Sequence, residues 1–239
     1  MPLEFPLSWT APRDLLPREG ELVVVLAPLD VSDERREGML RTFAPRELER
    51  YTSFRHDEHR FRWGTARGTL REVLGSALGI APAEVAFTYG GHGKPGVAGG
   101  KFRFNLSHSD GLGLLVMGHV EVGADIELPR VRRSDDIARR FYTPGENARL
   151  FAMEKEARDD AFFRLWTCKE AFLKCTGEGL SRSTRSYEIE VTAGGARLLW
   201  AENADATRFS IHPLEVAEPY RAAVVAEGHG LKVRQHRWP

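Results

Sequence analysis

The sequence predicts a mixed α/β fold, and three observations favour this class. The chain has 239 residues, 42% of them hydrophobic, which is enough to bury one large core or two small ones. Short apolar runs typical of strands alternate with longer segments of helical periodicity. The two halves share a rough order of elements, in which helices precede an apolar strand, although the sequence contains no exact repeat. We therefore expect two related halves, residues 1–118 and 119–239.

The first half begins with an apolar run at residues 22–26, which predicts a buried strand. Residues 46–78 show a strongly helical pattern, with apolar residues on one side and arginines on the other, so a long amphipathic helix is expected there. A glycine-rich loop follows at residues 89–100. Residues 102–106 then predict a strand, and residues 107–111 predict a polar turn.

Two apolar segments lie around the expected boundary between the halves, residues 112–120 and 122–128, and they predict two more strands. Helices are expected to begin at Ser134 and at Thr143, because Thr143 suits an N-cap and the proline after it suits the first helical position. A long helix over residues 161–175 is followed by a glycine. Further strands are predicted at residues 187–191, 196–200, 208–212 and 220–226.

The charge balance and the cysteine spacing limit which partners and which metal or disulfide sites are expected. Lys and Arg together number 34, as do Asp and Glu, so no nucleic-acid or membrane partner is expected. The two cysteines, Cys168 and Cys175, show neither a zinc-binding nor a disulfide-framework spacing. The first five residues lack a basic region followed by an apolar run, and no segment approaches the ~20 apolar residues of a membrane-spanning helix. We therefore expect no signal peptide and a cytoplasmic protein.

Two carboxylates lie on one predicted strand, at Asp125 and Glu127. Because side chains alternate along a strand, both project to the same side, where they repel each other unless a cation lies between them. Hard oxygen ligands with room for water suit Mg²⁺. The same pattern also fits the solvent-exposed side of an edge strand, so these two acids alone leave both interpretations open.

The long helix of the second half carries Glu170 and Lys174, which are four residues apart and share one face. Alone, this pair is typical of a surface ion pair. Combined with the two strand acids, the helix offers three carboxylates, with Lys169 as a second lysine. Carboxylates and lysines that meet around magnesium and a phosphate are the chemistry of phosphoryl-group transfer.

Three residues that precede the two strand acids in the sequence could hold a phosphate. Lys94 lies in the glycine-rich loop, where backbone donors are accessible to an anion. Ser107 and His108 follow a predicted strand and could donate hydrogen bonds to phosphate oxygens. A solvated loop lysine and an ordinary polar turn explain the same residues equally well.

The order and spacing of five motifs resemble one family. These motifs are GKP at residues 93–95, FNLSHS at 104–109, GADIE at 123–127, WTCKEAFLK at 166–174 and GEGL at 177–180. With them the chain resembles the Sfp-type 4′-phosphopantetheinyl transferases. One departure is Ala124, where the family usually carries a branched aliphatic residue; it points away from the acids.

The resemblance implies a pseudo-dimer of two similar α/β halves in one chain, with coenzyme A bound between them. It implies a Mg²⁺-dependent enzyme of the holo-[acyl-carrier-protein] synthase type. Such an enzyme moves the phosphopantetheine arm of coenzyme A onto a serine of an apo acyl or peptidyl carrier protein and releases adenosine 3′,5′-bisphosphate. The longer, two-half members of the family act as monomers, and they serve polyketide, nonribosomal peptide or fatty acid synthesis.

The resemblance also implies roles at the metal. The acids Asp125, Glu127 and Glu170 would hold Mg²⁺. Glu170 would also be the base for the incoming serine hydroxyl, directly or through water. Lys174 would contact the pyrophosphate.

Coenzyme A would be held by residues of the first half. Ser107 and His108 would bind its 3′-phosphate, and the loop with Lys94 and Pro95 would line the adenine. Three arginines of the basic helical segment match the family only in their general character and are candidates for the same phosphates. They are Arg46, Arg50 and Arg62.

Two other functions fit the same residues. A Mg²⁺-dependent hydrolase would cleave coenzyme A or a nucleotide with water, although the acids of such enzymes usually cluster on one helix. A non-catalytic module would bind coenzyme A or a carrier protein, but a degenerate member should have lost an acid or the helix lysine, and this chain keeps all four.

Overall fold

The computed structural model describes residues 14–130, 134–179 and 182–239. The N-terminal segment on which the signal-peptide expectation rests, and the last residue of the GEGL motif, lie outside the described residues. The helices are α1 (Asp33–Leu40), α2 (Pro45–Thr52), α3 (Asp57–Leu78), α4 (Ser134–Phe141), α5 (Pro144–Phe151) and α6 (Lys155–Thr176), with short 3₁₀ turns η1 (Pro82–Glu84) and η3 (Ala206–Arg208). Within these ranges, no helix has both the length and the apolar character that crossing a membrane requires.

The strands form two main sheets and one small hairpin. The strands are β1 (Glu21–Pro28), β2 (Phe87–Tyr89), β3 (Pro95–Val97), β4 (Arg103–Ser109), β5 (Leu112–Gly118), β6 (Val122–Glu127), β7 (Tyr187–Thr192), β8 (Gly195–Ala201), β9 (Phe209–Leu214), β10 (Arg221–Glu227) and β11 (Lys232–Arg237). The first sheet has the order β11-β1-β5-β4, and the second has the order β6-β10-β9-β8-β7. Strands β2 and β3 pair only with each other.

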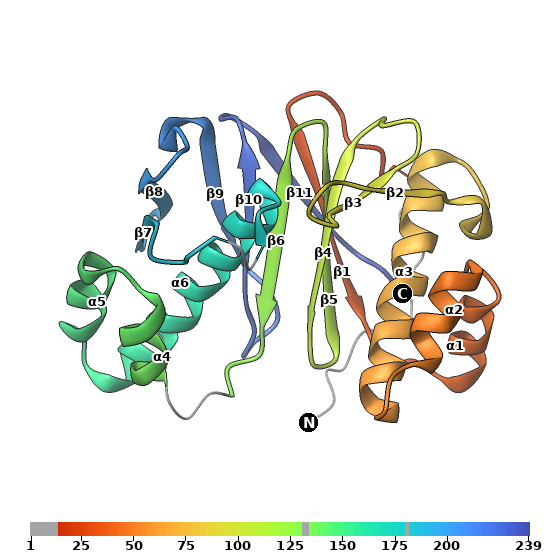
Figure 1. The fold of residues 1–239 in the computed structure, drawn as a ribbon, viewed down its shortest axis with the longest axis horizontal. Coiled ribbons are helices and arrows are strands. Elements are labelled where there is room, and N and C mark those ends of the chain that lie inside the picture. The colour runs from red at the N-terminus through yellow and green to blue at the C-terminus, as the bar shows by residue number, and fades with distance from the viewer. Residues whose placement is uncertain (1–13, 131–133, 180–181) are drawn as a thin grey trace.

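The two sheets pack against each other, and one long helix covers the outer face of each (Figure 1). Helix α3 packs on the first sheet and α6 on the second. Both helices have 22 residues, and both end at a glycine in the left-handed conformation, Gly79 and Gly177. The mixed α/β fold with two similar halves is therefore confirmed.

The alternation of side chains along the strands separates the apolar layers. On β1, Val23 packs in the cluster with α3, whereas Val24 packs between the sheets. On β6, Ala124 belongs to the layer between the sheets. Its neighbour Asp125 therefore projects to the other side of β6, where α6 packs.

The predicted helix over residues 46–78 is two helices instead of one, α2 and α3. The two fold back on each other, because the ring of Tyr51 on α2 packs against Gly64 on α3. A Cβ at residue 64 would lie 2.6 Å from that ring. Helical periodicity cannot show this break, since both helices carry the same amphipathic pattern.

The predicted polar turn at residues 107–111 is also wrong for its first three residues. Strand β4 continues through Ser109, which pairs with Leu112 of β5. Only Asp110 and Gly111 form the turn, and Asp110 has a φ of 50°. Ser107, His108 and Ser109 therefore alternate between the two faces of a strand.

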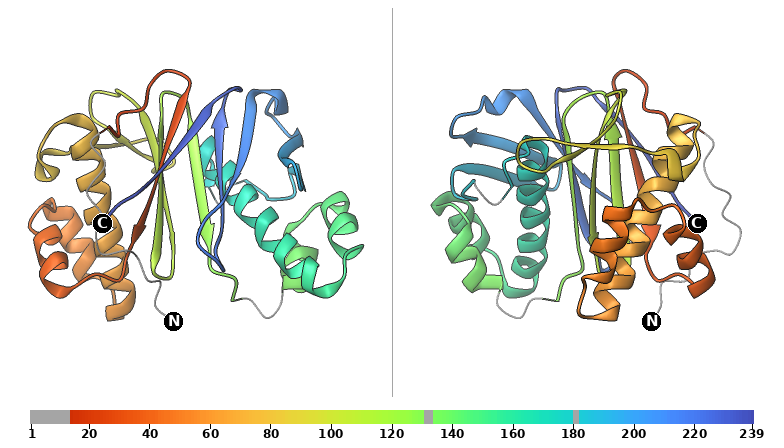
Figure 2. Two further views of the ribbon diagram at one scale, coloured as in Figure 1. Left: turned by 180° about the vertical axis from the view of Figure 1, so that it is seen from behind. Right: turned by 45° about the vertical axis from the view of Figure 1, so that its right-hand side comes forward.

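The last strand, β11, was not predicted. It leaves the second half and pairs in parallel with β1, with Glu21 opposite Lys232. Both views in Figure 2 place the C-terminus beside the helices of the first half. Trp238, which follows β11, is 6% exposed and packs in the core of the first half.

Candidate active site where the two sheets meet

The predicted acids lie where the edge strands of the two sheets meet. Strand β4 ends the first sheet and β6 ends the second. Side chains of β4 bridge the junction: the hydroxyl of Ser107 donates to Asp125 Oδ1 at 3.0 Å, and that of Ser109 donates to Glu127 Oε2 at 3.0 Å. The fold thus brings the FNLSHS and GADIE motifs into direct contact.

A close approach of α6 to β6 adds the helix residues to this site. The approach depends on Gly123, because a Cβ there would lie 2.0 Å from the carbonyl oxygen of Ala171 and 2.3 Å from the backbone nitrogen of Cys175. No side chain larger than hydrogen fits at this contact. The glycine of the GADIE motif therefore sets the distance between the strand acids and the helix that carries Glu170 and Lys174.

Asp125 is the most buried of the three acids, with 3% of its surface exposed. Its Oδ1 accepts hydrogen bonds from Ser107 and, at 2.5 Å, from Lys174 Nζ. Its Oδ2 is buried and has no hydrogen-bond partner in the described ranges. A buried carboxylate oxygen without a donor is costly, so this atom is available to a cation.

Glu170 lies one turn before Lys174 on α6 and is half-buried. Its carboxylate makes no hydrogen bond or ion pair within the described part of the chain. In the part of the chain that the structure describes, the carboxylate of Glu127 is bonded only by Ser109. The structure thus brings together all three predicted metal ligands and the predicted helix lysine.

The electrostatics of the cluster indicate a shortage of positive charge. Burial raises the pKa of Asp125 above its ordinary value, and Lys174 and Ser107 only partly oppose this effect. Burial, followed by repulsion from Asp125, raises the pKa of Glu127 and of Glu170. A further cation close to the cluster would therefore favour the ionised form of all three carboxylates.

The donor set fits Mg²⁺ in its chemistry. Glu127 and Glu170 both lie close enough to Asp125 for its charge to raise their pKa values, and among the described residues Asp125 keeps one oxygen without a donor. In the described ranges, no three His, Cys, Asp or Glu side chains are arranged to hold a metal by themselves. Mg²⁺ usually takes one or two carboxylates and completes its shell with water and substrate phosphates, so a closed protein cage is not required.

A cavity of about 400 Å³ opens on the other face of β4. Its wall includes His108 from β4 and Arg62 from α3, and its other lining residues are Phe54, Arg55, His56, His59, Trp63 and Asp110. Arg62 also forms ion pairs of 2.8 Å with Glu58 and Asp110. Burial against this wall, then the charges of Lys174 and Arg62, hold the pKa of His108 below its ordinary value. The cavity therefore offers cationic and aromatic groups close to the acid cluster.

The other predicted phosphate residues lie in different surroundings. Arg50 is exposed on α2, with its guanidinium 4.8 Å from the ring of Phe54 at the cavity. Arg46 is exposed on α2 and does not line the cavity. The hydroxyl of Ser107 donates to Asp125 and accepts from Lys174, so it faces the acids rather than the cavity.

Lys94 makes three contacts with the second half of the chain. Its Nζ donates to Glu121 at 2.8 Å and to the carbonyl oxygens of Val122 and Cys175, both at 2.9 Å. An ammonium group has three donors, so all of them are used within the protein. Pro95, next in the loop, begins β3 and is half-buried. The structure therefore directs Lys94 to protein acceptors.

The sequence did not predict one buried ion pair that supports the site. Lys169 is 1% exposed and donates to both carboxylate oxygens of Glu146, at 2.7 and 2.9 Å. Burial lowers the pKa of Lys169 to about 8, against the opposing charge of Glu146. Since Lys169 precedes Glu170, this buried pair fixes the rotation of α6. The spacing of Thr143 and Glu146, a capping box that the structure confirms, was the available signal.

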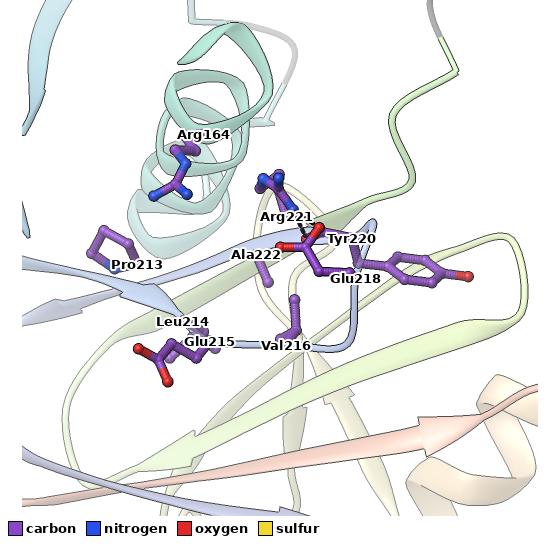
Figure 3. Close-up of a pocket in the computed structure, with 9 residues that line it drawn as sticks. All are labelled: Arg164, Pro213, Leu214, Glu215, Val216, Glu218, Tyr220, Arg221 and Ala222. Carbon is purple, nitrogen blue, oxygen red and sulfur yellow. Dashed lines mark hydrogen bonds and ion pairs between the residues drawn. The ribbon is translucent and has the colours of Figure 1, made fainter. Parts of the chain in front are cut away.

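A second cavity, of about 410 Å³, lies between the first turns of α6 and the β9–β10 connection (Figure 3). It adjoins the end of the acid-bearing strand, because its residue Arg221 pairs with Glu127 across β10 and β6. Arg221 and Arg164, which both line it, are bonded to Asp160 at 2.5 and 2.7 Å. Its positive charges are thus already balanced, and no predicted site residue lines it.

Comparison with known proteins agrees with this geometry. Residues 121–225 match the model of the 4′-phosphopantetheinyl transferase superfamily. The chain is 36% identical to the 4′-phosphopantetheinyl transferase HetI of Nostoc sp. over 188 residues, covering 76% of this chain and 78% of that protein. It is 27% identical to the 4′-phosphopantetheinyl transferase Sfp of Bacillus subtilis over 197 residues, covering 82% of this chain and 87% of that protein.

Among solved structures, the holo-(acyl-carrier-protein) synthase of Bacillus anthracis, in complex with coenzyme A (3′,5′-ADP), aligns with a TM-score of 0.37 and 23% identity. The alignment covers 46% of this chain and 97% of that chain. The sequence relatives cover most of both chains, and they confirm the resemblance drawn from the motifs. The chain belongs to the 4′-phosphopantetheinyl transferase superfamily and is a transferase enzyme.

Proposed function

We propose that this chain transfers the 4′-phosphopantetheine arm of coenzyme A to a serine of an apo carrier protein, with Mg²⁺, and releases adenosine 3′,5′-bisphosphate. One observation carries the proposal. A cluster of the buried Asp125 and the half-buried Glu127 and Glu170, with Lys174 among them, adjoins a cationic cavity through strand β4. Family membership supports the reaction class.

The cavity beside β4 suits the nucleotide end of coenzyme A. His108 and Arg62 line it together and would bind the 3′-phosphate, while Phe54 and Trp63 provide aromatic surface. The low pKa of His108 favours its neutral form, so a bound phosphate dianion would draw a proton onto the ring. The loop at residues 93–95 remains the candidate for the adenine contact.

The acid cluster suits the pyrophosphate. Asp125, Glu127 and Glu170 would hold Mg²⁺, which when bound neutralises the charge that develops as the phosphoanhydride bond breaks. Lys174 Nζ lies beside the carboxylate of Asp125 and would contact the pyrophosphate there. Because its carboxylate has no bonding partner among the described residues, Glu170 would take the proton of the serine hydroxyl, directly or through a water.

In the transfer step, the serine oxygen attacks the phosphorus that bears the pantetheine arm. The bond from that phosphorus to the bridging oxygen of adenosine 3′,5′-bisphosphate breaks. The serine proton passes to Glu170 or its water. We further propose that the chain acts as a monomer in the cytoplasm, with residues 1–118 and 119–239 as its two halves. The division into halves is supported by the two main sheets, each of which takes its strands from one half except for β11.

Intact-mass spectrometry of an apo carrier protein tests the proposal. The carrier is incubated with the chain, coenzyme A and Mg²⁺, with a parallel reaction that contains a chelator. The expected result is a gain of one phosphopantetheine group that is lost with the chelator. Free phosphopantetheine would instead indicate a hydrolase, and coenzyme A binding with no mass gain on any carrier would indicate a binding module.

A further inference from the structure

The side chains of β4 that face β6 form a regular series of contacts. Asn105 Oδ1 accepts the backbone N–H of Ala124 at 2.9 Å. Ser107 bonds Asp125, and Ser109 bonds Glu127. The members of the series are two residues apart on β4, so they share one side of that strand through the alternation of its side chains.

These contacts compensate for the position of β6 at the edge of its sheet. Strand β6 pairs with β10 on one side only, so alternate backbone N–H groups on its other side lack a strand partner. The N–H of Ala124 is bonded by Asn105, and the N–H of Leu128, just after the strand, is bonded by Ser109 at 3.1 Å. The first sheet thus provides side-chain acceptors where a neighbouring strand would provide carbonyl groups.

Ser109 is the member of the series with two partners in the acid-bearing segment. Its hydroxyl donates to Glu127 Oε2 at 3.0 Å while its oxygen accepts the N–H of Leu128. One side chain therefore holds both the carboxylate of Glu127 and the peptide that follows it. Glu127 has no other hydrogen-bond donor among the described residues, so its orientation depends on this one hydroxyl.

We infer that Ser109 is a positioning residue for the proposed metal ligand Glu127, and that its hydroxyl sets the orientation of this carboxylate near Asp125 and Glu170. This inference rests on the proposed function, because it concerns the same Mg²⁺ site. In this role Ser109 acts through Glu127 and is not itself a ligand. Groups that orient a metal ligand in this way typically change metal affinity about 10–100-fold when removed.

The test compares Mn²⁺ binding to full-length variants by electron paramagnetic resonance, with urea unfolding measured in parallel. Ser109→Ala is expected to weaken Mn²⁺ binding about tenfold or more, and Ser109→Thr, which keeps the hydroxyl, should remain close to the wild type. Ser210→Ala is the matched control, since Ser210 is also a half-buried strand serine, but the described partner of its hydroxyl is His212. Its Mn²⁺ affinity should be unchanged.

Equal Mn²⁺ affinity in Ser109→Ala and the wild type would overturn the inference. So would an equal loss in Ser109→Thr, or a loss in Ser109→Ala that is matched by Ser210→Ala. A wild-type chain that binds no Mn²⁺ would overturn both the metal assignment and the role of Ser109. The transferase proposal is judged separately, by the mass of the carrier protein.

Discussion

Lys174 Nζ lies 2.5 Å from Asp125 Oδ1, so the helix of the second half carries a cation into the acid cluster. Ser107 bonds both groups, at 2.9 Å from Lys174 and 3.0 Å from Asp125. The charge of Lys174 lowers the pKa of all three acids, but it does not offset their burial or the repulsion that Asp125 exerts on Glu127 and Glu170. The raised pKa values that result lead to the first two predictions.

Replacing Asp125 with Asn should abolish transfer while leaving the fold intact. The amide keeps the size of the side chain and a hydrogen-bonding oxygen for Lys174, but it removes the charge that would bind the metal. A loss of about 10²-fold or more in kcat is expected, in line with the removal of one electrostatic contact to a transition state. Carrier modification and circular dichroism measure the two effects. Near-normal turnover in the folded variant would contradict the metal assignment.

Replacing Glu170 with Gln should make stability less dependent on pH. The folded pKa of Glu170 lies above its ordinary value of 4.5, so its stabilising contribution is present below that value and is lost as pH rises through the folded pKa. Gln stays neutral at every pH, so the variant has no such loss of stability. In thermal melting without metal, the Tm of the variant relative to that of the wild type should therefore rise as the pH increases from 4.5 through the folded pKa of Glu170. A constant difference in Tm would show that Glu170 is not destabilised by its neighbours.

Replacing His108 with Ala should weaken the binding of coenzyme A but not of dephospho-coenzyme A, because only the former carries the 3′-phosphate. Loss of a charged hydrogen bond predicts a rise in KM of about 10–100-fold. His212→Ala is a suitable control, since His212 lies on β9 and bonds Ser210. If His108→Ala raises KM for both substrates equally, His108 has a different role.

Replacing Lys94 with Met should lower stability, because three acceptors of the second half lose their donor. The ion pair with Glu121 is partly exposed, so a decrease of about 1–3 kcal/mol in the free energy of unfolding is expected. Urea unfolding measures it, with the exposed Lys101→Met as control. Unchanged stability together with weaker coenzyme A binding would restore the ligand role that the GKP motif suggested.

Replacing Trp238 with Ala should destabilise the first half of the chain. Trp238 fills the core under α3, and its Nε1 donates to Glu72 at 2.9 Å. Truncation of a buried aromatic side chain typically costs about 3–5 kcal/mol, which urea unfolding would detect. Trp200→Ala, on β8 and 40% exposed, should cost much less. Equal losses in the two variants would mean that β11 contributes little to the first half.

The sequence predicted most elements because their causes are local. The N-cap at Thr143, the alternation around Asp125 and the glycine that ends α6 each depend on neighbours within a few residues. The same local patterns showed that Asp125 and Glu127 share one side of a strand. Motif spacing then led to the correct family.

The tertiary structure decided the relations between distant segments. Pairing of Glu21 with Lys232, the fold-back of Tyr51 onto Gly64 and the three contacts of Lys94 join residues that no local pattern connects. Ser107 shows the consequence: its motif suggested a phosphate contact, whereas the position of β6 beside β4 turns it to Asp125. Periodicity determines the face on which a side chain lies, and only the packing of the two sheets decides what that face contacts.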